Sequence, residues 1–165
     1  MVKILVISDT HGDTSWINEL LLSHSDYDFF LHLGDSELPG YMLSPFASVK
    51  GNCDYYNDYP PTRTIVTKYG SLYLEHGNHY IDDEYVLSKD VKIFLHGHTH
   101  SHYVRKIDDN HYIANPGSYS RPRDGSNGTY LEIYLSENSV EFKFKNRYLN
   151  SFHILQLKQL VLRYL

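Results

Sequence analysis

Aspartate, asparagine and histidine, whose side chains readily bind divalent metal ions, occur in five short clusters that each contain glycine. Each cluster follows an apolar run of the kind that forms a buried strand. Strand ends in an α/β sheet converge on one crevice where ligands bind, so we expect the clusters to meet in one site. They are Asp9-Thr10-His11-Gly12, Gly34-Asp35, Gly51-Asn52-Cys53-Asp54, His76-Gly77 and Gly97-His98-Thr99-His100.

The donor groups in these clusters are carboxylates, imidazoles and one amide, a set that suits Mn, Fe, Co, Ni or Zn. Structural zinc usually recruits cysteine thiolates, which are not required here. The donors are too many for one tetrahedral zinc, but they suit two cations that share one carboxylate and leave positions open for water and substrate. Two cations about 3.5–4 Å apart can clamp a phosphate and activate a water, so the sequence predicts phosphoester hydrolysis. The predicted metal ligands are Asp9, His11, Asp35, Asn52, His76, His98 and His100.

Histidines outside this set have other expected positions. His32 lies inside an apolar run and is predicted to be a hydrogen-bonded core residue beneath the site. His24 is expected at the surface. Neither is a predicted ligand.

Hydrophobic patterning predicts the elements that position the clusters. Alternation of strand and helix in the first part, followed by antiparallel hairpins, predicts an α/β domain with two sheets. Predicted strands that end at a cluster are 2–7, 29–33, 47–50, 72–75 and 91–95, and predicted hairpin turns lie near 69–71, 108–110 and 136–139.

Two short helices are predicted within this pattern. Asp13 or Thr14 is expected to cap a helix whose apolar face runs from Trp16 to His24. Asp82 or Asp83 is expected to cap a helix that reaches Lys89.

Size and patterning predict one compact domain over residues 1–148. The chain has 165 residues, of which 41% are hydrophobic, enough for a substantial core. Residues 149–165 are rich in leucine and are expected to form a helical extension, packed on the domain or on a partner subunit of a homo-oligomer.

Charge and cysteine content restrict the partners and the compartment. The formal charge is −5 with no basic run, which argues against strong nucleic-acid binding and against a nuclease acting on DNA or RNA polymers. The single cysteine cannot form an internal disulfide, and the apolar stretch from Ile4 to Ile7 is too short for a signal peptide or a membrane span. We therefore expect a cytoplasmic protein without a membrane partner.

The ordered series Asp-x-His, Gly-Asp, Gly-Asn-x-Asp, His-Gly and Gly-His-x-His resembles the calcineurin-like metallophosphoesterase superfamily, most closely its small YfcE-like phosphodiesterases. The likeness extends from Val2 to about Phe144. The segments Ile113–Ser118 and Arg121–Arg123 are similar to those that close the site in that group. The resemblance implies an α/β fold, a four-layer αββα sandwich of two mixed β-sheets flanked by helices.

The resemblance also implies a role for each ligand. Two divalent ions are implied, with manganese expected first and iron, nickel, cobalt or zinc also compatible. The first ion would be held by Asp9, His11 and His100, the second by Asn52, His76 and His98, and Asp35 would bridge them.

The implied reaction is attack of a metal-bridging hydroxide on the phosphorus of a small phosphoester, with a phosphodiester expected first. Asp54 would orient its neighbours rather than bind metal. The implied catalytic residues are Asp35, Asn52, Asp54 and His76, and the implied substrate-binding residues are Asn52, Cys53 and Arg121.

The chain departs from the larger relatives at two positions. Cys53 stands where many of them have a histidine that contacts substrate, and Asn78 replaces a histidine or aspartate, a loss for which His79 could compensate. The alternative to an enzyme is a non-catalytic metal-binding scaffold of the same fold, like the eukaryotic retromer subunit. The intact set of ligand positions favours the enzyme.

Overall fold

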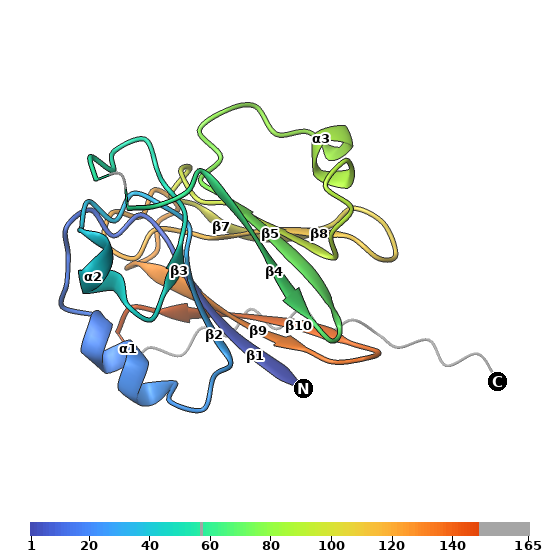
Figure 1. Cartoon of the computed structure of the whole chain (residues 1–165), viewed down its shortest axis with the longest axis horizontal. Coiled ribbons are helices and arrows are strands. Elements are labelled where there is room, and N and C mark those ends of the chain that lie inside the picture. Colours follow the sequence, from blue (N-terminus) through green and yellow to red (C-terminus); the bar gives the residue numbers. More distant parts are fainter. Residues whose placement is uncertain (57, 149–165) are drawn as a thin grey trace.

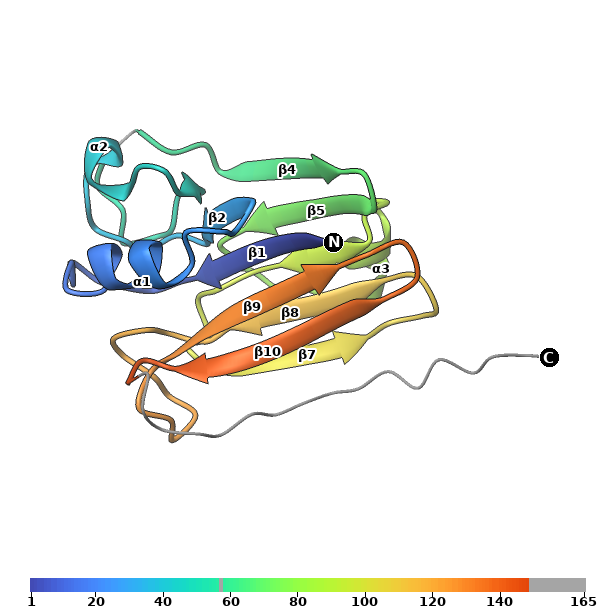
Figure 2. The same cartoon turned by 90° about the horizontal axis from the view of Figure 1, so that it is seen from below.

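The computed structural model describes residues 1–56 and 58–148, which form two five-stranded sheets stacked face to face (Figures 1 and 2). The first sheet has the order β10-β9-β1-β2-β3 and the second the order β4-β5-β6-β8-β7. The first consists of β1 (Val2–Ile7), β2 (Phe29–His32), β3 (Ala47–Ser48), β9 (Thr129–Leu135) and β10 (Val140–Asn146). The second consists of β4 (Thr62–Thr67), β5 (Gly70–Glu75), β6 (Ile93–Leu95), β7 (His102–Lys106) and β8 (Tyr112–Pro116).

Both sheets are mixed. In the first, β1 pairs in parallel with β2 and antiparallel with β9. In the second, β5 pairs in parallel with β6 and antiparallel with β4. The strands β1 and β5 point toward the same end of the sandwich (Figure 2), and β2 and β6 pair with them in parallel, so the loops that follow these four strands lie at that end.

Alternating side chains of the strands build three apolar layers between four structural layers. In β1, Ile4 and Val6 join the core between the sheets, whereas Leu5 and Ile7 pack beneath the helix α1 (Ile17–Ser23) and the one-turn helix α2 (Gly40–Leu43). In β6, Phe94 faces outward and packs with Val86 of α3 (Asp83–Leu87). The order α1 and α2, first sheet, second sheet, α3 is the predicted four-layer αββα sandwich, with short helices in both outer layers.

Two helix starts differ in how well they were predicted. Asp82 caps α3 as expected, because its Oδ1 accepts a hydrogen bond of 2.8 Å from the Tyr85 N–H. The predicted cap of α1 was wrong: α1 starts at Ile17, and Asp13 Oδ1 instead accepts from Ser15 N at 2.9 Å. The indole Nε1 of Trp16 donates to the Asp13 carbonyl, so an extra turn before the helix buries the tryptophan.

The expected surface position of His24 was also wrong. His24 is buried, and its Nε2 lies 3.2 Å from Oε1 of Glu132 on β9. Burial alone would raise the pKa of Glu132, but hydrogen bonds from His24 and Tyr134 outweigh it and leave that pKa lowered. A long-range hydrogen bond therefore joins the end of α1 to the first sheet, a partnership that helical spacing does not indicate.

The expected helix at 149–165 lies outside the described residues. Among the residues that are described, no helix is long and apolar enough to cross a membrane.

Candidate metal centre

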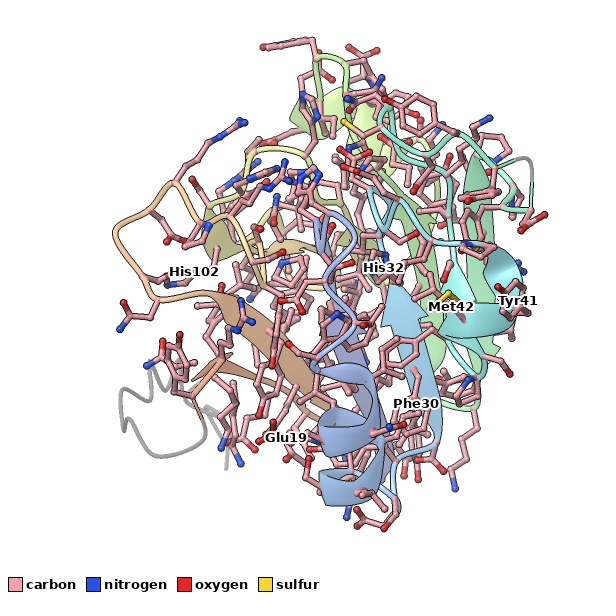
Figure 3. The ribbon with its side chains drawn as sticks, turned by 90° about the vertical axis from the view of Figure 1, so that its left-hand side faces the viewer. Glu19, Phe30, His32, Tyr41, Met42 and His102 are labelled. Atoms are coloured by element: carbon pink, nitrogen blue, oxygen red, sulfur yellow. The ribbon has the colours of Figure 1, made fainter. Side chains whose placement is uncertain are left out.

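The loops after β1 and β2 run side by side at the end of the sandwich that Figure 3 faces, where His32 lies at the end of β2. Asp9 N donates to the Gly34 carbonyl at 3.1 Å, and His11 N donates to the Asp35 carbonyl at 3.0 Å. The loops after β5 and β6 are joined in the same way, because Gly97 N donates to the His76 carbonyl at 3.0 Å. Backbone hydrogen bonds therefore join the loops that bear predicted ligands in two pairs.

Asp9, His11 and His100 form the first donor group. One donor atom from each lies within 4.8 Å of the other two. Nε2 of His100 is 3.2 Å from Nε2 of His11 and 3.2 Å from Oδ1 of Asp9. The structure therefore brings together the three residues that were predicted to hold the first ion.

Asp9 also belongs to a second donor group, with Asp35 and His76. Nε2 of His76 lies 3.3 Å from Oδ2 of Asp35 and 3.0 Å from Oδ1 of Asn52. His98 is more distant: its ring centroid is 5.2 Å from that of His76, although its backbone N–H donates to Asp9 Oδ2 at 3.1 Å. The two groups share the Asp9 carboxylate, and the Asp35 carboxylate belongs to the second group, beside His76.

Three of the histidines direct the same ring nitrogen toward the centre. Nδ1 of His76 donates to the Leu33 carbonyl at 2.8 Å, and Nδ1 of His100 donates to the Arg121 carbonyl at 2.6 Å. Nδ1 of His11 lies 2.7 Å from Oε1 of Glu37. With the proton of each neutral ring on Nδ1, Nε2 is left as a lone-pair donor, which is how protein metal sites orient their histidines.

A buried carboxylate oxygen of Asp9 indicates whether the residues present fit a cation. Oδ1 of Asp9 is buried and accepts no hydrogen bond of good geometry among the described residues, although Nε2 of His100 lies 3.2 Å away. A buried oxygen left in this way is costly unless a cation satisfies it. The oxygen and nitrogen donors around it are of the kind that Mn, Fe, Co, Ni and Zn share. The residues present therefore fit divalent metal ions.

Five predicted ligands have backbone conformations that L-residues rarely adopt. The φ angles of Asp9, His11, Asp35, His98 and His100 lie between 45° and 67°. Each such residue costs about 1 kcal/mol or more, and strain of this kind is typical of functional sites. The strain is consistent with a functional role, because these turns direct the five side chains into one site.

Hydrogen bonds and charges within the centre shift the pKa values of three of its side chains. Burial raises the pKa of Asp35, but hydrogen bonds from His76 and from Cys53 N outweigh it and hold the pKa below its usual range. Burial lowers the pKa of His76, but the Asp35 carboxylate outweighs it and leaves the pKa raised. The Asp9 carboxylate likewise raises the pKa of His100.

These shifts predict that metal affinity rises with pH. Protonated His76 and His100 cannot donate to a cation, and their raised pKa values extend that competition above the ordinary histidine value of about 6.5. We expect Mn²⁺ affinity, measured by isothermal titration calorimetry, to increase between about pH 6 and pH 8, with proton release on binding. An affinity that is constant over this range would contradict the assigned donors.

Asp54 positions two of the loops through its carboxylate. Its Oδ2 accepts from Asp35 N at 2.9 Å and from Gly51 N at 2.7 Å, and its Oδ1 accepts from Glu37 N at 2.7 Å. Asp54 belongs to neither donor group. This geometry supports the expected orienting role.

The segment at 115–121 holds the loops from the other side. Asn115 Nδ2 donates to the Gly97 carbonyl at 2.7 Å, and Ser118 Oγ donates to the Asp9 carbonyl at 2.7 Å. Arg121 contributes its carbonyl to His100, while the residue itself is exposed. Its predicted role in substrate binding remains a proposal.

Glu37 is the group at this site that the sequence reading missed. Its side chain is 29% exposed and lies against His11, whose second nitrogen faces the metal donors. The available signal was its spacing two residues after Asp35 in Gly34-Asp35-Ser36-Glu37. An acidic residue two positions after a predicted ligand at a strand end can reach the same site.

His32 is buried beneath the centre as expected and links two ligand loops. Gly34 N donates to His32 Nδ1 at 3.2 Å, so that nitrogen accepts and Nε2 carries the proton toward Thr10 Oγ1, 3.0 Å away. Burial lowers the pKa of His32 to about 4, so the ring is neutral at physiological pH. Its neighbours Thr10 and Gly34 each adjoin a predicted ligand.

Replacing His32 by leucine is expected to weaken Mn²⁺ binding about 10- to 100-fold, the usual effect of losing a residue that supports metal ligands. His32→Gln should recover part of the affinity, because its amide can still donate to Thr10. Isothermal titration calorimetry measures both variants, and His111→Leu, at a half-buried histidine paired with Asp108, serves as the control. Wild-type affinity in His32→Leu would show that the link is dispensable.

Comparison with known proteins relates this geometry to one family. Residues 2–138 match the calcineurin-like phosphoesterase superfamily domain. The chain is 28% identical over 169 residues to the probable metallophosphoesterase YsnB of Bacillus subtilis, with 94% of this chain and 97% of the relative covered.

Solved structures share the fold. A predicted phosphoesterase from Streptococcus pneumoniae superposes with a TM-score of 0.80 at 25% identity, covering 94% of this chain and 97% of that one. The phosphoesterase YfcE of E. coli superposes with a TM-score of 0.67 at 21% identity, over 94% and 98% of the two chains. Zinc-bound Vps29 of Entamoeba histolytica has a TM-score of 0.74 at 20% identity, also over 94% and 98%. The last two likenesses concern the fold alone.

Proposed function

The chain belongs to the calcineurin-like phosphoesterase superfamily, and from this membership and the geometry of the centre we propose that it hydrolyses a small phosphodiester with two bound divalent cations. The observation that carries the proposal is that two donor groups share the Asp9 carboxylate and that the second group adds the Asp35 carboxylate. A carboxylate between two groups of donors is the arrangement that a pair of cations needs.

We assign Asp9, His11 and His100 to one cation, and Asn52, His76 and His98 to the other, with Asp35 between them. Bound cations at these positions would neutralise charge on the reacting phosphate and lower the pKa of an attacking water. We propose manganese as the ion that works in the cell, although the donor set also accommodates zinc, iron, cobalt and nickel.

The chain's own residues hold and orient the substrate. Asn52 is exposed, its Oδ1 faces His76, and its Nδ2 lies 3.3 Å from Cys53 Sγ, so the amide N–H groups can donate to a phosphate oxygen at the rim. Glu37 adds a partly exposed carboxylate beside His11. This negative charge disfavours the dianion of a monoester relative to the monoanion of a diester, which supports the choice of substrate.

A direct assay separates these substrates. Metal-free protein reconstituted with Mn²⁺ should hydrolyse bis-p-nitrophenyl phosphate faster than p-nitrophenyl phosphate. Chelation should abolish the activity, and added Mn²⁺ should restore it. Hydrolysis that survives chelation would refute the metal-dependent mechanism, and a preference for the monoester would refute the choice of a diester.

The alternative is a non-catalytic metal-binding scaffold; structures named Vps29 share this fold, and one of them was solved in complex with zinc. Against it, all seven predicted ligand positions carry a metal-binding side chain. For the setting of the reaction we propose the cytoplasm. A homo-oligomer is a further proposal, which sedimentation velocity can test.

Cys53 explains an expected preference for good leaving groups. Burial and the nearby Asp35 carboxylate raise the pKa of its thiol to about 11, so it is a weaker acid than an imidazolium. Cys53→His should raise turnover of alkyl phosphodiesters about ten- to a hundredfold and affect p-nitrophenyl esters much less, because p-nitrophenolate leaves without a proton. Equal effects on both substrates in steady-state assays would argue against a missing proton donor.

A further inference from the structure

Sulfur, oxygen and nitrogen donors meet at the rim of the centre. One donor atom each from Cys53, Glu37 and His11 lies within 4.8 Å of the other two. Neither Glu37 nor Cys53 belongs to the two donor groups of the main centre. We propose that these three residues form a third cation site, which takes a thiophilic divalent ion such as Zn²⁺ and opposes catalysis when it is filled.

Backbone hydrogen bonds hold the two rim donors in place. Glu37 N donates to Asp54 Oδ1 at 2.7 Å, and Cys53 N donates to Asp35 Oδ1 at 2.7 Å. Glu37 has a φ of 57°, a strained turn that directs its carboxylate at His11. The donors come from two loops that the fold has already joined, so little ordering is needed on binding.

Glu37 and Cys53 are more exposed than the inner carboxylates of the main centre. The side chains of Asp9 and Asp35 are at most 3% exposed, whereas that of Glu37 is 29% exposed and Cys53 is half-buried. An ion in solution can therefore reach the rim donors when the inner positions are already filled.

The donor types select the ion. A thiolate and a carboxylate together neutralise a divalent cation, and sulfur favours Zn²⁺, Cd²⁺ or Co²⁺ over Mn²⁺ or Mg²⁺. On binding, the S–H bond of Cys53 breaks, its proton passes to solvent, and a sulfur–metal bond forms. The Nδ1 proton of His11, which faces Glu37, moves to Nε2, and Nδ1 then binds the metal in place of that hydrogen bond.

His11 links the rim site to activity. Its Nε2 faces His100 in the first donor group, while its Nδ1 faces Glu37. A neutral ring has one lone-pair nitrogen, so a rim ion that takes Nδ1 moves the proton to Nε2 and removes that nitrogen from the main centre. The inhibitory consequence rests on the proposed function, whereas binding at the rim does not.

Cobalt provides a test that needs no turnover. Cys53 is the single cysteine, so any thiolate-to-cobalt charge-transfer absorption reports this residue. When Co²⁺ is titrated into metal-free protein, the first two equivalents should fill the main centre without that absorption, which should grow only with the third. Glu37→Gln should weaken the third binding step about 10- to 100-fold.

Two variants serve as matched controls. Cys53→Ser must lack the absorption. Glu19→Gln, which changes an exposed glutamate on α1, should bind Co²⁺ as the wild type does (Figure 3). Wild-type protein gives a second measurement, since a third equivalent of Zn²⁺ should protect Cys53 from alkylation. No thiolate absorption at any loading, or absorption with the first equivalent, would overturn the site. Binding that Glu37→Gln leaves unchanged would also overturn it.

Activity then tests the inhibitory part on its own. Zn²⁺ added to the Mn²⁺-loaded enzyme should lower diester hydrolysis about tenfold or more in the wild type. The same addition should have a smaller effect in Cys53→Ser, relative to that variant's own uninhibited rate. Equal inhibition of both proteins would assign the effect of Zn²⁺ to the main centre.

Discussion

Replacing Asp35 by asparagine is expected to lower phosphodiester hydrolysis about a thousandfold, the effect of raising the reaction barrier by about 4 kcal/mol. Asparagine keeps the shape of the side chain but removes the negative charge and one of the two oxygens. Asp35 Oδ1 accepts from Cys53 N and Oδ2 faces His76. These contacts fix the orientation of the carboxylate, with its two oxygens directed at different groups. The same substitution should reduce bound Mn²⁺ from two equivalents to at most one.

Metal content by elemental analysis and turnover of bis-p-nitrophenyl phosphate measure the two effects together. Asp109→Asn is the matched control, because the side chain of Asp109 is 98% exposed. Full metal content with wild-type turnover in Asp35→Asn would exclude a bridging role for this carboxylate.

The second large effect is expected at Gly51, which has no side chain of its own to contribute. A Cβ added there would overlap both Oδ1 and the backbone nitrogen of Asp35, far inside van der Waals contact. Because a backbone atom is involved, the loop must move rather than a flexible side chain. Misplacing a reacting group by 1 Å can cost about a hundredfold in rate, so Gly51→Ala should lose activity on that scale.

Gly125→Ala is the control for Gly51→Ala. Gly125 has a φ of 79° but nothing within 4 Å of an added Cβ, so the control carries backbone strain without a clash at the centre. Steady-state turnover and thermal unfolding should be measured on both variants. Gly51→Ala with normal turnover would mean that Asp35 can move freely without loss of function.

Strand ends were predictable because the strands and their clusters share one signal. The apolar runs before Asp9, Asp35, Asn52, His76 and His98 are short and end at glycine-containing turns. Parallel pairing of the strands and hydrogen bonds between the loops place all five turns at the same end of the sandwich. The family was predicted correctly from the same ordered series. Chemistry confined to strand ends leaves a strong sequence pattern.

Features that depend on the third dimension were not predictable in this way. The pairing of buried His24 with Glu132 joins residues 108 positions apart. Helical spacing describes the face of α1 but not what lies across from it. The spacing of Glu37 after Asp35 could have placed it near the site, but its contact with His11 depends on a left-handed turn that spacing does not predict.

For the ligand histidines, the residue type was predictable from the sequence, but the orientation of the ring was not. Residue type indicated metal binding at His76 and His100, but the carbonyls that fix their tautomers belong to Leu33 and Arg121, which carry no metal-binding signal. The choice of Nε2 as the donor atom is therefore a property of the fold.

Anomalous scattering from crystals grown with Mn²⁺ tests the paired cations most directly. Two peaks about 3.5–4 Å apart are expected, with the Asp35 carboxylate between them. Asp9, His11 and His100 should surround one peak, and Asn52, His76 and His98 the other. A single peak, or two peaks with Asp35 turned away from both, would contradict a dinuclear centre in this protein.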